Sequence, residues 1–489
     1  MRENVMNGWR FTCVALGCLI TLCACAVGPD YKGPSSTISH AAQPPAFRRV
    51  GTVKTDESQP PAARWWLALN DAELTHLIET AFQNSPNVRA AQSRLRQARA
   101  ALREQQRKEL PTSSAAAVYL RARTPALGSL AGQNQSDNTD SGSAGHSTLS
   151  LYDVGFDATW ELDIFGGTRR AIEAARAQAQ ASQADLDDLH VSMAAEVAQT
   201  YIALRDQQQR LALSRRSAEA ESQILDFTQQ RRARGAASEA DLEKLHVQLE
   251  TTRGTLIPLQ AQIEASLNSL AVLTGAEPGA LDTELAAAGP LPEVPAAVAI
   301  GDPTSMLRRR PDIRAAERAL ASANAKIGTE VANYFPKVNF LGDIGWGSSG
   351  SHGLLDSRNL TLVAAPILQW NVLDFGRTRA RIVQAEGARD EDAAKYEMTV
   401  LSALEDAETS LSRFGRQRDS VLSLARISTS AGRSYALTEQ RYKAGVASMI
   451  DLLDSERTRL DAQQNEIQGR AQLVQHYASL QKSLGLGWE

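Results

Sequence analysis

The chain has 489 residues, a formal net charge of −4 and a sequence pI of about 6.1. These values argue against a polyanionic partner, because a nucleic-acid-binding protein needs Lys and Arg clustered on one face. Outside the N-terminus, no stretch approaches the roughly 20 apolar residues of a membrane-spanning helix. If this chain crosses a membrane, we expect it to do so with strands.

Residues 1–24 are typical of a bacterial lipoprotein signal peptide. Basic residues flank an apolar stretch from Phe11 to Ala24, which is too short to span a membrane as a helix. All four cysteines lie in this segment or directly after it: Cys13, Cys18, Cys23 and Cys25. The first three are interpreted as apolar filler, whereas Cys25 stands where lipoproteins are cleaved and acylated. We predict that Cys25 is lipidated and that residues 25–64 form a lipid-anchored tether.

The remaining chain contains an internal duplication. Pro86 and its neighbours recur around Pro311, 225 residues later, whereas Trp160 recurs as Trp370, 210 residues later. The two repeats therefore differ by one deletion of 15 residues, which lies between Pro111 and Trp160. Because only one Ser/Gly/Asn-rich loop is out of register, we expect that loop to lie outside the packed structure.

The first repeat is predicted to span residues 65–275. Its helical pattern begins near Asp71 and breaks around Pro86, then resumes and stops at Pro111. A β-hairpin is expected over residues 112–165.

A long helical hairpin follows in the first repeat. Gly and Pro are absent from Thr168 to Arg234, which predicts a helix of roughly 95–100 Å at about 1.5 Å per residue. A turn at Gly235 returns the chain along residues 238–273, where Pro258 is expected to kink the helix.

A Pro-rich linker, residues 276–302, is predicted to join the first repeat to the second, which spans residues 303–487. The second repeat is expected to contain helices, a β-hairpin over residues 337–375 and a second long helical hairpin. Its helices are divided by a turn at Gly445 and the last one covers residues 448–484.

Alternating polarity marks the strands. From Asp153 to Leu162, apolar residues occupy every second position, which is the period of a strand with one apolar face. Four such strands cannot close a barrel by themselves, since small barrels begin near eight strands. Strand edges cannot stay unpaired in a bilayer, so the strands must close with copies of themselves. Three copies give twelve strands above twelve helices, and such an assembly is hollow.

Five features in this order resemble the outer membrane factor family, the TolC-like channels, and specifically its NodT-type lipoproteins. They are the tether after Cys25, Leu307-Arg308-Arg309-Arg310-Pro311-Asp312-Ile313, Tyr334-Phe335-Pro336, Leu373-Asp374-Phe375-Gly376 and the paired helical turns. The resemblance covers the chain from Cys25 to about Gly487. Ala26 after the cysteine agrees with sorting to the outer membrane.

The resemblance implies a mainly α fold with a membrane β-barrel portion. A homotrimer would form a 12-stranded outer-membrane barrel, continued by a long periplasmic α-helical barrel. The implied function is a passive exit duct of a tripartite efflux pump, which carries drugs and toxic compounds outward. Its implied partners are a periplasmic adaptor, an inner-membrane pump and outer-membrane lipid. No cofactor, metal, nucleic acid or enzymatic activity is implied.

The two helical turns are the first candidate site. Residues 230–242 and 440–452 share residue types at matching places: Arg231, Gly235, Ser238 and Asp241 in the first turn, and Arg441, Gly445, Ser448 and Asp451 in the second. A purely structural interpretation is that each Gly supplies positive φ and each Ser caps the next helix. The resemblance implies that these tips dock onto the adaptor.

Asp451 and Asp454 form the second candidate site. They lie three residues apart on one helical face and match positions where TolC has aspartates narrowing its closed pore. The alternative is that they only complement the helix dipole. The first repeat has Lys244 where the second has Asp454, so a constriction is expected mainly from the second repeat. The family sometimes has an Arg latch where this chain has Ala447.

Other patterns carry no site. Arg308–Arg310 is interpreted as solvated charge at a helix end, which bridges to acidic neighbours. Gly345-x-Gly347-x-x-Gly350 matches a dinucleotide fingerprint by letter but ends a strand, with no helix following. The seven histidines lack metal-ligand spacing, and no nucleophile elbow exists, so an enzyme is not indicated.

Two alternatives stay open. The first is a lipid-anchored, trimeric coiled-coil scaffold of the periplasm that does not conduct. Such a scaffold needs no strands of alternating polarity, so the hairpins argue against it. The second lies within the channel class, since a metal-efflux duct or a type I secretion duct would have the same pattern.

Overall fold

The computed structural model describes residues 26–34, 46–51, 62–125, 146–350 and 354–488. The predicted signal peptide, Cys25 and parts of the predicted tether lie outside the described residues. The chain divides into two compact units. Unit 1 contains the described parts of residues 1–33, 98–179 and 319–392, and unit 2 contains the described parts of 34–97, 180–318 and 393–489.

The helices confirm the duplication, because matching helices have equal lengths. The pairs are α4 (Pro86–Arg107) and α8 (Pro311–Ala332) with 22 residues, α5 (Gly167–Ala233) and α9 (Arg377–Lys443) with 67, and α6 (Glu239–Leu273) and α10 (Met449–Ser483) with 35. Three short elements complete the helical part: η1 (Trp65–Leu69), α3 (Ala72–Asn84) and α7 (Pro303–Arg309).

Helix boundaries follow the capping residues. Asp71, the predicted cap, accepts a hydrogen bond from the Leu74 backbone N–H at 2.9 Å and starts α3. Asp302 starts α7 in the same way through Ser305. Pro258 lies inside α6, and the helix continues on both sides of it.

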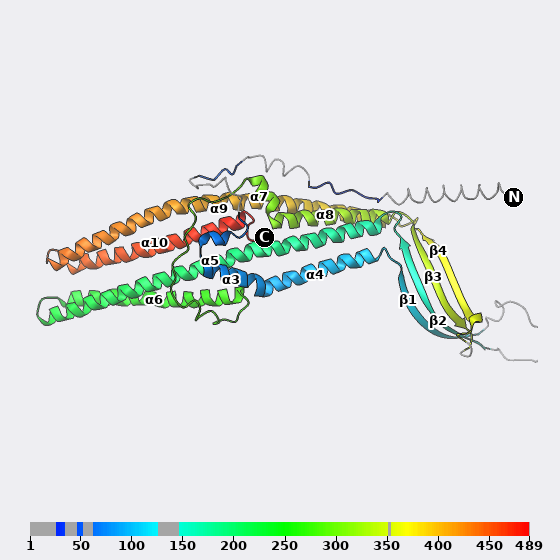
Figure 1. Cartoon of the computed structure of the whole chain (residues 1–489), viewed down its shortest axis with the longest axis horizontal. Helices are drawn as coiled ribbons and strands as arrows, with labels where there is room; N and C mark the ends of the chain where they lie inside the picture. The colour runs from blue at the N-terminus through cyan, green and yellow to red at the C-terminus, as the bar shows by residue number, and fades with distance from the viewer. Residues whose placement is uncertain (1–25, 35–45, 52–61, 126–145, 351–353, 489) are drawn as a thin grey trace, which may run out of the picture. The chain divides into compact units, whose positions relative to one another are not determined.

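Unit 1 contains one antiparallel sheet rather than two separate hairpins. Its order is β1 (Thr112–Pro125), β2 (His146–Leu162), β3 (Lys337–Ser348) and β4 (Leu360–Gln369), as Figure 1 shows. A short 3-10 helix, η2 (Ser357–Asn359), precedes β4. Strands β2 and β3 pair across the two repeats, with Phe156 opposite Ile344.

The register gathers the apolar side chains on one face of the sheet. Directly paired residues share a face, and the apolar pairs include Phe156 with Ile344, Ile344 with Leu362, and Val338 with Leu368. Asp157 pairs with Asp343 on the other face. Leu362 is 76% exposed and Leu368 is 65% exposed in the single chain. The predicted period of two is therefore confirmed, and the described residues of this chain leave a broad apolar surface uncovered.

The junction between helices and strands contains the same contact twice. Trp160 Nε1 donates to the Glu109 backbone carbonyl at 2.9 Å, and Trp370 Nε1 donates to the Tyr334 carbonyl at 3.0 Å. Phe165 and Phe335 stack with ring centroids 4.6 Å apart. Each indole N–H has a partner although its ring lies beside apolar residues, a placement typical of Trp at a polar boundary.

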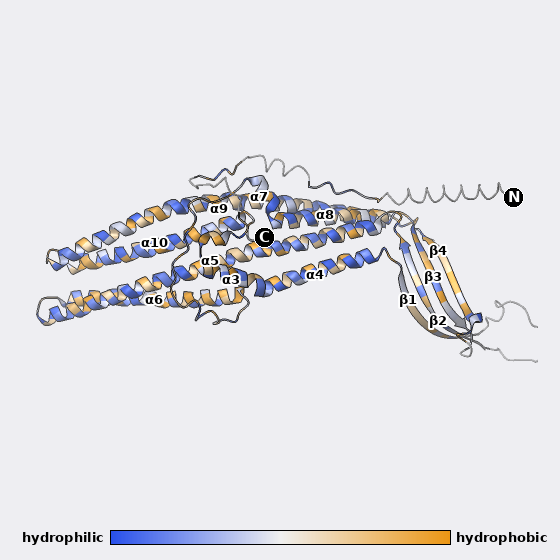
Figure 2. Ribbon diagram, in the orientation of Figure 1, coloured by the Kyte–Doolittle hydropathy of each residue, from blue (hydrophilic) through white to orange (hydrophobic). Residues whose placement is uncertain are grey.

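The main core lies in unit 2. The largest fully buried side chains come from η1, α3, α5, α6 and α9, together with a residue of the linker: Trp65, Trp66, Leu74, Leu77, Ile78, Tyr201, Ile202, Leu204, Leu270, Leu285 and Phe414. Trp65 packs edge-on against Tyr477 at a centroid distance of 5.9 Å. Apolar and polar residues are interspersed along the long helices (Figure 2).

The interpretation of Arg308–Arg310 as solvated charge is wrong for Arg310, which is 9% exposed. Arg310 does bridge to acidic neighbours, since its guanidinium pairs with Asp312 at 2.6 Å and with Asp406 at 3.6 Å. It also donates to the Ser483 carbonyl at 2.8 Å. Arg309 donates to the Leu484 carbonyl at 3.0 Å. Two arginines of the second repeat thus satisfy the carbonyl groups at the end of α10.

We predict that Arg310→Ala lowers the free energy of unfolding of the helical part by about 3 kcal/mol, because it leaves Asp312 and the α10 carbonyls without their buried partner. Arg308 is exposed and forms no ion pair within the described ranges, so Arg308→Ala should change this free energy by less than about 0.5 kcal/mol. Denaturant titration followed by circular dichroism measures both. Equal effects of the two variants would contradict the assignment.

Candidate functional site

Both helical turns have the same backbone geometry. Gly235 and Gly445 have φ of 72° and 76°. In the first turn the Ala236 N–H donates to the Arg231 carbonyl at 2.9 Å, and in the second the Val446 N–H donates to the Arg441 carbonyl at 2.9 Å. These are Schellman motifs, in which a glycine at positive φ ends the helix. Each Gly therefore has the structural role that the sequence indicated.

The serines after the turns cap the returning helices. Ser238 Oγ accepts from the Asp241 N–H at 3.1 Å, and Ser448 Oγ accepts from the Asp451 N–H at 3.2 Å. In the second repeat the bond is reciprocal, since the Ser448 N–H donates to Asp451 Oδ2 at 2.9 Å. This is a complete capping box.

The capping box also lowers the pKa of the Asp451 carboxyl. Hydrogen bonds from the Ser448 backbone N–H and hydroxyl hold the pKa of the Asp451 carboxyl below its usual value, and Arg441 adds a smaller effect. Because the folded pKa is lowered, this carboxylate stabilises the cap at neutral pH and loses that effect as pH falls through the folded pKa. Asp454 lies one helical turn further, is exposed, and its side chain has no hydrogen bond or ion pair in the described part of the chain.

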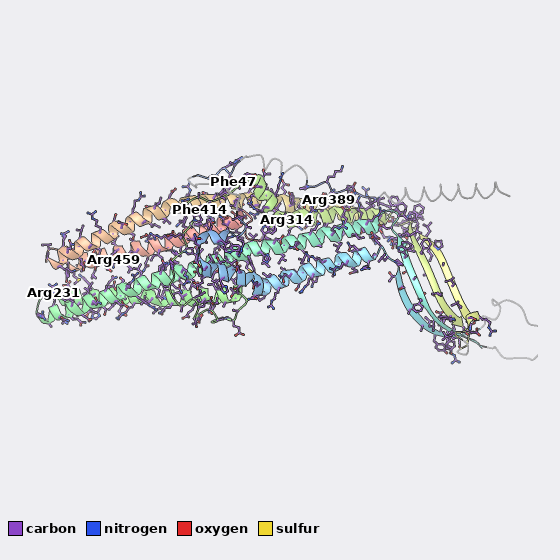
Figure 3. The ribbon with its side chains drawn as sticks, viewed as in Figure 1. Phe47, Arg231, Arg314, Arg389, Phe414 and Arg459 are labelled. Carbon is purple, nitrogen blue, oxygen red and sulfur yellow. The ribbon has the colours of Figure 1, made fainter. Side chains whose placement is uncertain are left out.

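The two hairpins meet at a cluster of apolar residues near the turns, here called the tip cluster. Its members come from α5, α6 and α10: Ala218, Leu225, Leu242, Leu245, Leu249, Met449 and Leu452. Arg231 lies near the first turn (Figure 3) and its Nη1 donates to the Tyr442 hydroxyl of α9 at 3.1 Å. The Arg231 guanidinium carbon is 5.9 Å from the centroid of the same ring. Arg231 therefore connects the two repeats.

Sequence reasoning found Arg231 but missed its partner. The two residues are 211 positions apart, and no local spacing relates them. Arg441, the counterpart in the second repeat, lies close enough to Asp451 to affect its pKa. The two arginines occupy matching positions in the repeats but have different surroundings.

The predicted lipid site, Cys25, lies outside the described residues, but the segment directly after it is docked on unit 1. The Val27 N–H donates to the Phe165 carbonyl at 3.1 Å. Arg170, whose side chain is 6% exposed, pairs with Asp30 at 2.6 Å and donates to the Val27 carbonyl. Asn324 donates to the Pro29 carbonyl at 3.0 Å. Phe165, Arg170 and Asn324 therefore hold this segment through four interactions.

None of the helices in the described ranges is long and apolar enough to cross a membrane.

A sequence model of the outer membrane efflux protein family matches residues 77–276 and 303–486. Outer membrane protein OprJ of Pseudomonas aeruginosa is 29% identical over 476 residues, which cover 97% of this chain and 95% of OprJ. Pyoverdine export outer membrane protein OpmQ of Pseudomonas putida is 31% identical over 459 residues, or 91% of this chain and 92% of OpmQ.

The solved structure of the outer-membrane channel OprN superposes with a TM-score of 0.85 at 31% identity, and the match covers 95% of this chain and 100% of that chain. The family resemblance drawn from the motifs is thereby confirmed. The chain belongs to the outer membrane efflux protein family and is an outer-membrane efflux duct with the TolC-like fold.

Proposed function

We propose that three copies of this chain form a passive duct that carries small molecules outward for a tripartite efflux pump. One observation carries the proposal: the sheet has an apolar face and two outer edges, on β1 and β4, without a partner strand among the described residues. Strand edges in a bilayer must pair, and three copies would supply twelve strands. OpmQ is named for export of a small molecule, which supports this class of cargo.

The proposed partners at the helical turns are a periplasmic adaptor and, through it, an inner-membrane pump. Both turns are closed by backbone hydrogen bonds. In the second repeat, Val446 of the turn is 66% exposed and Ile450 at the start of α10 is 46% exposed. Rigid turns with a few exposed apolar residues suit a docking surface because little conformational entropy is lost on binding. Arg231 contributes indirectly, since its side chain is committed to Tyr442.

We predict that Gly445→Val abolishes efflux while the assembled protein persists in the outer membrane. A Cβ at Gly445 meets no atom within 4 Å, so the damage is backbone strain at positive φ, on the order of 1–3 kcal/mol, and is confined to the turn. Efflux of a fluorescent dye and the amount of assembled protein are measured together. Gly254→Val, in an open site of α6 without positive φ, is the control. Loss of assembly in Gly445→Val would show that the turn serves folding rather than docking.

The proposed gate is a ring of Asp451 and Asp454 carboxylates from the three copies. Asp carboxyl groups are ionised at neutral pH, and hydrogen bonds from Ser448 lower the pKa of Asp451 further. A narrow ring would therefore favour cations over anions and bind multivalent cations. Because like charges oppose closure, other contacts such as Arg231 with Tyr442 would hold the resting state shut.

We predict that the double variant Asp451→Asn/Asp454→Asn loses block by divalent and trivalent cations and has reduced cation selectivity in planar bilayers. Ser448→Ala is the control for the damaged cap, since it removes the capping hydroxyl and keeps both charges. Asp241→Asn tests the first repeat, where Lys244 replaces the second carboxylate. If block and selectivity stay unchanged in the double variant, both aspartates are ordinary surface charges.

We also propose that Cys25 is the acylated first residue of the mature protein. Val27 is docked two residues further on, so the acyl chains would enter the membrane close to the junction of strands and helices.

We predict an N-terminal peptide that begins at lipid-modified Cys25 in mass spectrometry of the purified protein. Cys25→Ser should weaken membrane targeting more than assembly. An N-terminus upstream of Cys25, or an unmodified thiol there, would exclude the anchor.

A further inference from the structure

A pair of buried carboxyl groups lies between the two helical hairpins, close to the tip cluster. Glu221 of α5 is 1% exposed and Glu456 of α10 is 3% exposed. Glu456 is fully partnered, because Arg459 donates to both of its oxygens and the Ser217 hydroxyl donates at 3.3 Å. The Arg459 guanidinium also lies 4.7 Å from the ring centroid of Tyr435 on α9 (Figure 3).

Among the described residues, Glu221 has no cationic partner. Its Oε1 accepts from Gln248 Nε2 at 3.2 Å and from the Thr252 hydroxyl at 3.0 Å, both on α6. Its Oε2 is buried without a hydrogen-bond partner in the described part of the chain. A carboxylate in such a place bears the full cost of an uncompensated charge, whereas a neutral carboxyl group does not.

The groups around Glu221 also favour its neutral, protonated form. Gln248 and Thr252 of α6 are uncharged, Ser217 of α5 is uncharged, and Glu456 of α10 carries a like charge. Arg459 faces Glu456 and Tyr435, and Glu439 of α9 lies near Arg459. Burial, and then the Glu456 charge, raise the pKa of the Glu221 carboxyl, while the bonds from Thr252 and Gln248 lower it.

The second repeat shows that this polar arrangement is not needed to pack a helical hairpin. At the spacing of 210 residues, Glu221 corresponds to Ala431 and Thr252 to Ala462. Both alanines are buried, at 7% and 6% exposure. The same type of hairpin is thus built with alanine at both places, so the buried acid of the first repeat requires another explanation.

We propose that Glu221 is a proton-dependent positioning residue of the duct: with its proton the α5–α6 hairpin packs against α10, and without it the two hairpins separate near the turns. Separation lets water reach the carboxylate and relieves its repulsion from Glu456. The proposal rests on the duct function and on the proposed gate near Asp451, because parting hairpins at this level would widen the narrow end.

The sign of the pH dependence follows from the linkage between packing and protonation. The carboxyl has a higher pKa in the packed state than in the separated, hydrated state. Packing is therefore fully favoured below the pKa of the separated state and is lost as pH rises through the pKa of the packed state. Between these two pKa values, each pH unit should raise the ratio of separated to packed molecules about tenfold, and the ratio levels off above the pKa of the packed state.

Hydrogen–deuterium exchange of the assembled full-length protein, from about pH 6 to about pH 9, tests the proposal. After correction for intrinsic exchange, uptake in α6 and the first turns of α10 should rise with pH in the wild type. Glu221→Gln should remove this rise and keep exchange slow at every pH. Glu250→Gln removes an exposed carboxyl of α6 that pairs with Arg253 and should keep the rise.

One further variant and one spectroscopic signal distinguish the proposal from a folding defect. Glu221→Ala/Thr252→Ala installs the alanines of the second repeat and should also be insensitive to pH. The infrared band of a protonated carboxyl group should be present near neutral pH in the wild type and absent in Glu221→Gln. The proposal fails if exchange responds to pH equally in the wild type and both Glu221 variants, or if this band is missing.

Single-channel conductance separates this proposal from the proposed gate. If exchange responds to pH through Glu221 and conductance rises in parallel, both proposals are supported. If exchange responds and conductance does not, the positioning role of Glu221 in hairpin packing is supported. The link between Glu221 and opening of the duct, and with it the proposed position of the gate, is then overturned.

Discussion

The hydrogen bonding of strand edges is the constraint on which the structure depends. Strands β1 and β4 each have one side without a partner strand among the described residues, while the apolar face of the sheet includes Phe156, Ile344 and Leu362. Lipid can cover that face but cannot satisfy backbone N–H and C=O groups. We therefore infer that other copies of the chain complete these edges.

The duplication supplies two equivalent hairpins, and the differences between them carry the functional argument. Contacts that serve architecture occur twice, as with Trp160 on the Glu109 carbonyl and Trp370 on the Tyr334 carbonyl. Near the turns, the backbone geometry and the serine caps also occur twice, but several side chains differ between the repeats. Asp454 has Lys244 as its counterpart, and Glu221 has Ala431. These positions distinguish the two helical hairpins of one chain, and the proposed gate and the proposed role of Glu221 rest on them.

Much of the fold could be predicted because its signals are local. Pro86, Gly235 and Ser448 mark helix boundaries within a residue or two, and the period of two identified strands with their apolar face. Contacts between distant parts could not be predicted. Arg310 was expected to be solvated but is buried by the end of α10. Local sequence could not predict this contact, because the two segments lie more than 170 residues apart in the chain. The contact of Arg231 with Tyr442 and the proximity of Glu221 to Glu456 depend on how helices from both repeats meet. No residue spacing within one helix reveals such contacts.

The central claim is that this chain completes its sheet only by assembly, and the number of chains in the purified particle tests it most directly. Native mass spectrometry of the protein released from mild detergent measures that number. If the sheet is completed by assembly, the spectrum should contain a single species of three chains, with twelve strands in all, that persists until the detergent is made denaturing. A stable, folded species of one chain would leave the edges of β1 and β4 open and would contradict the account.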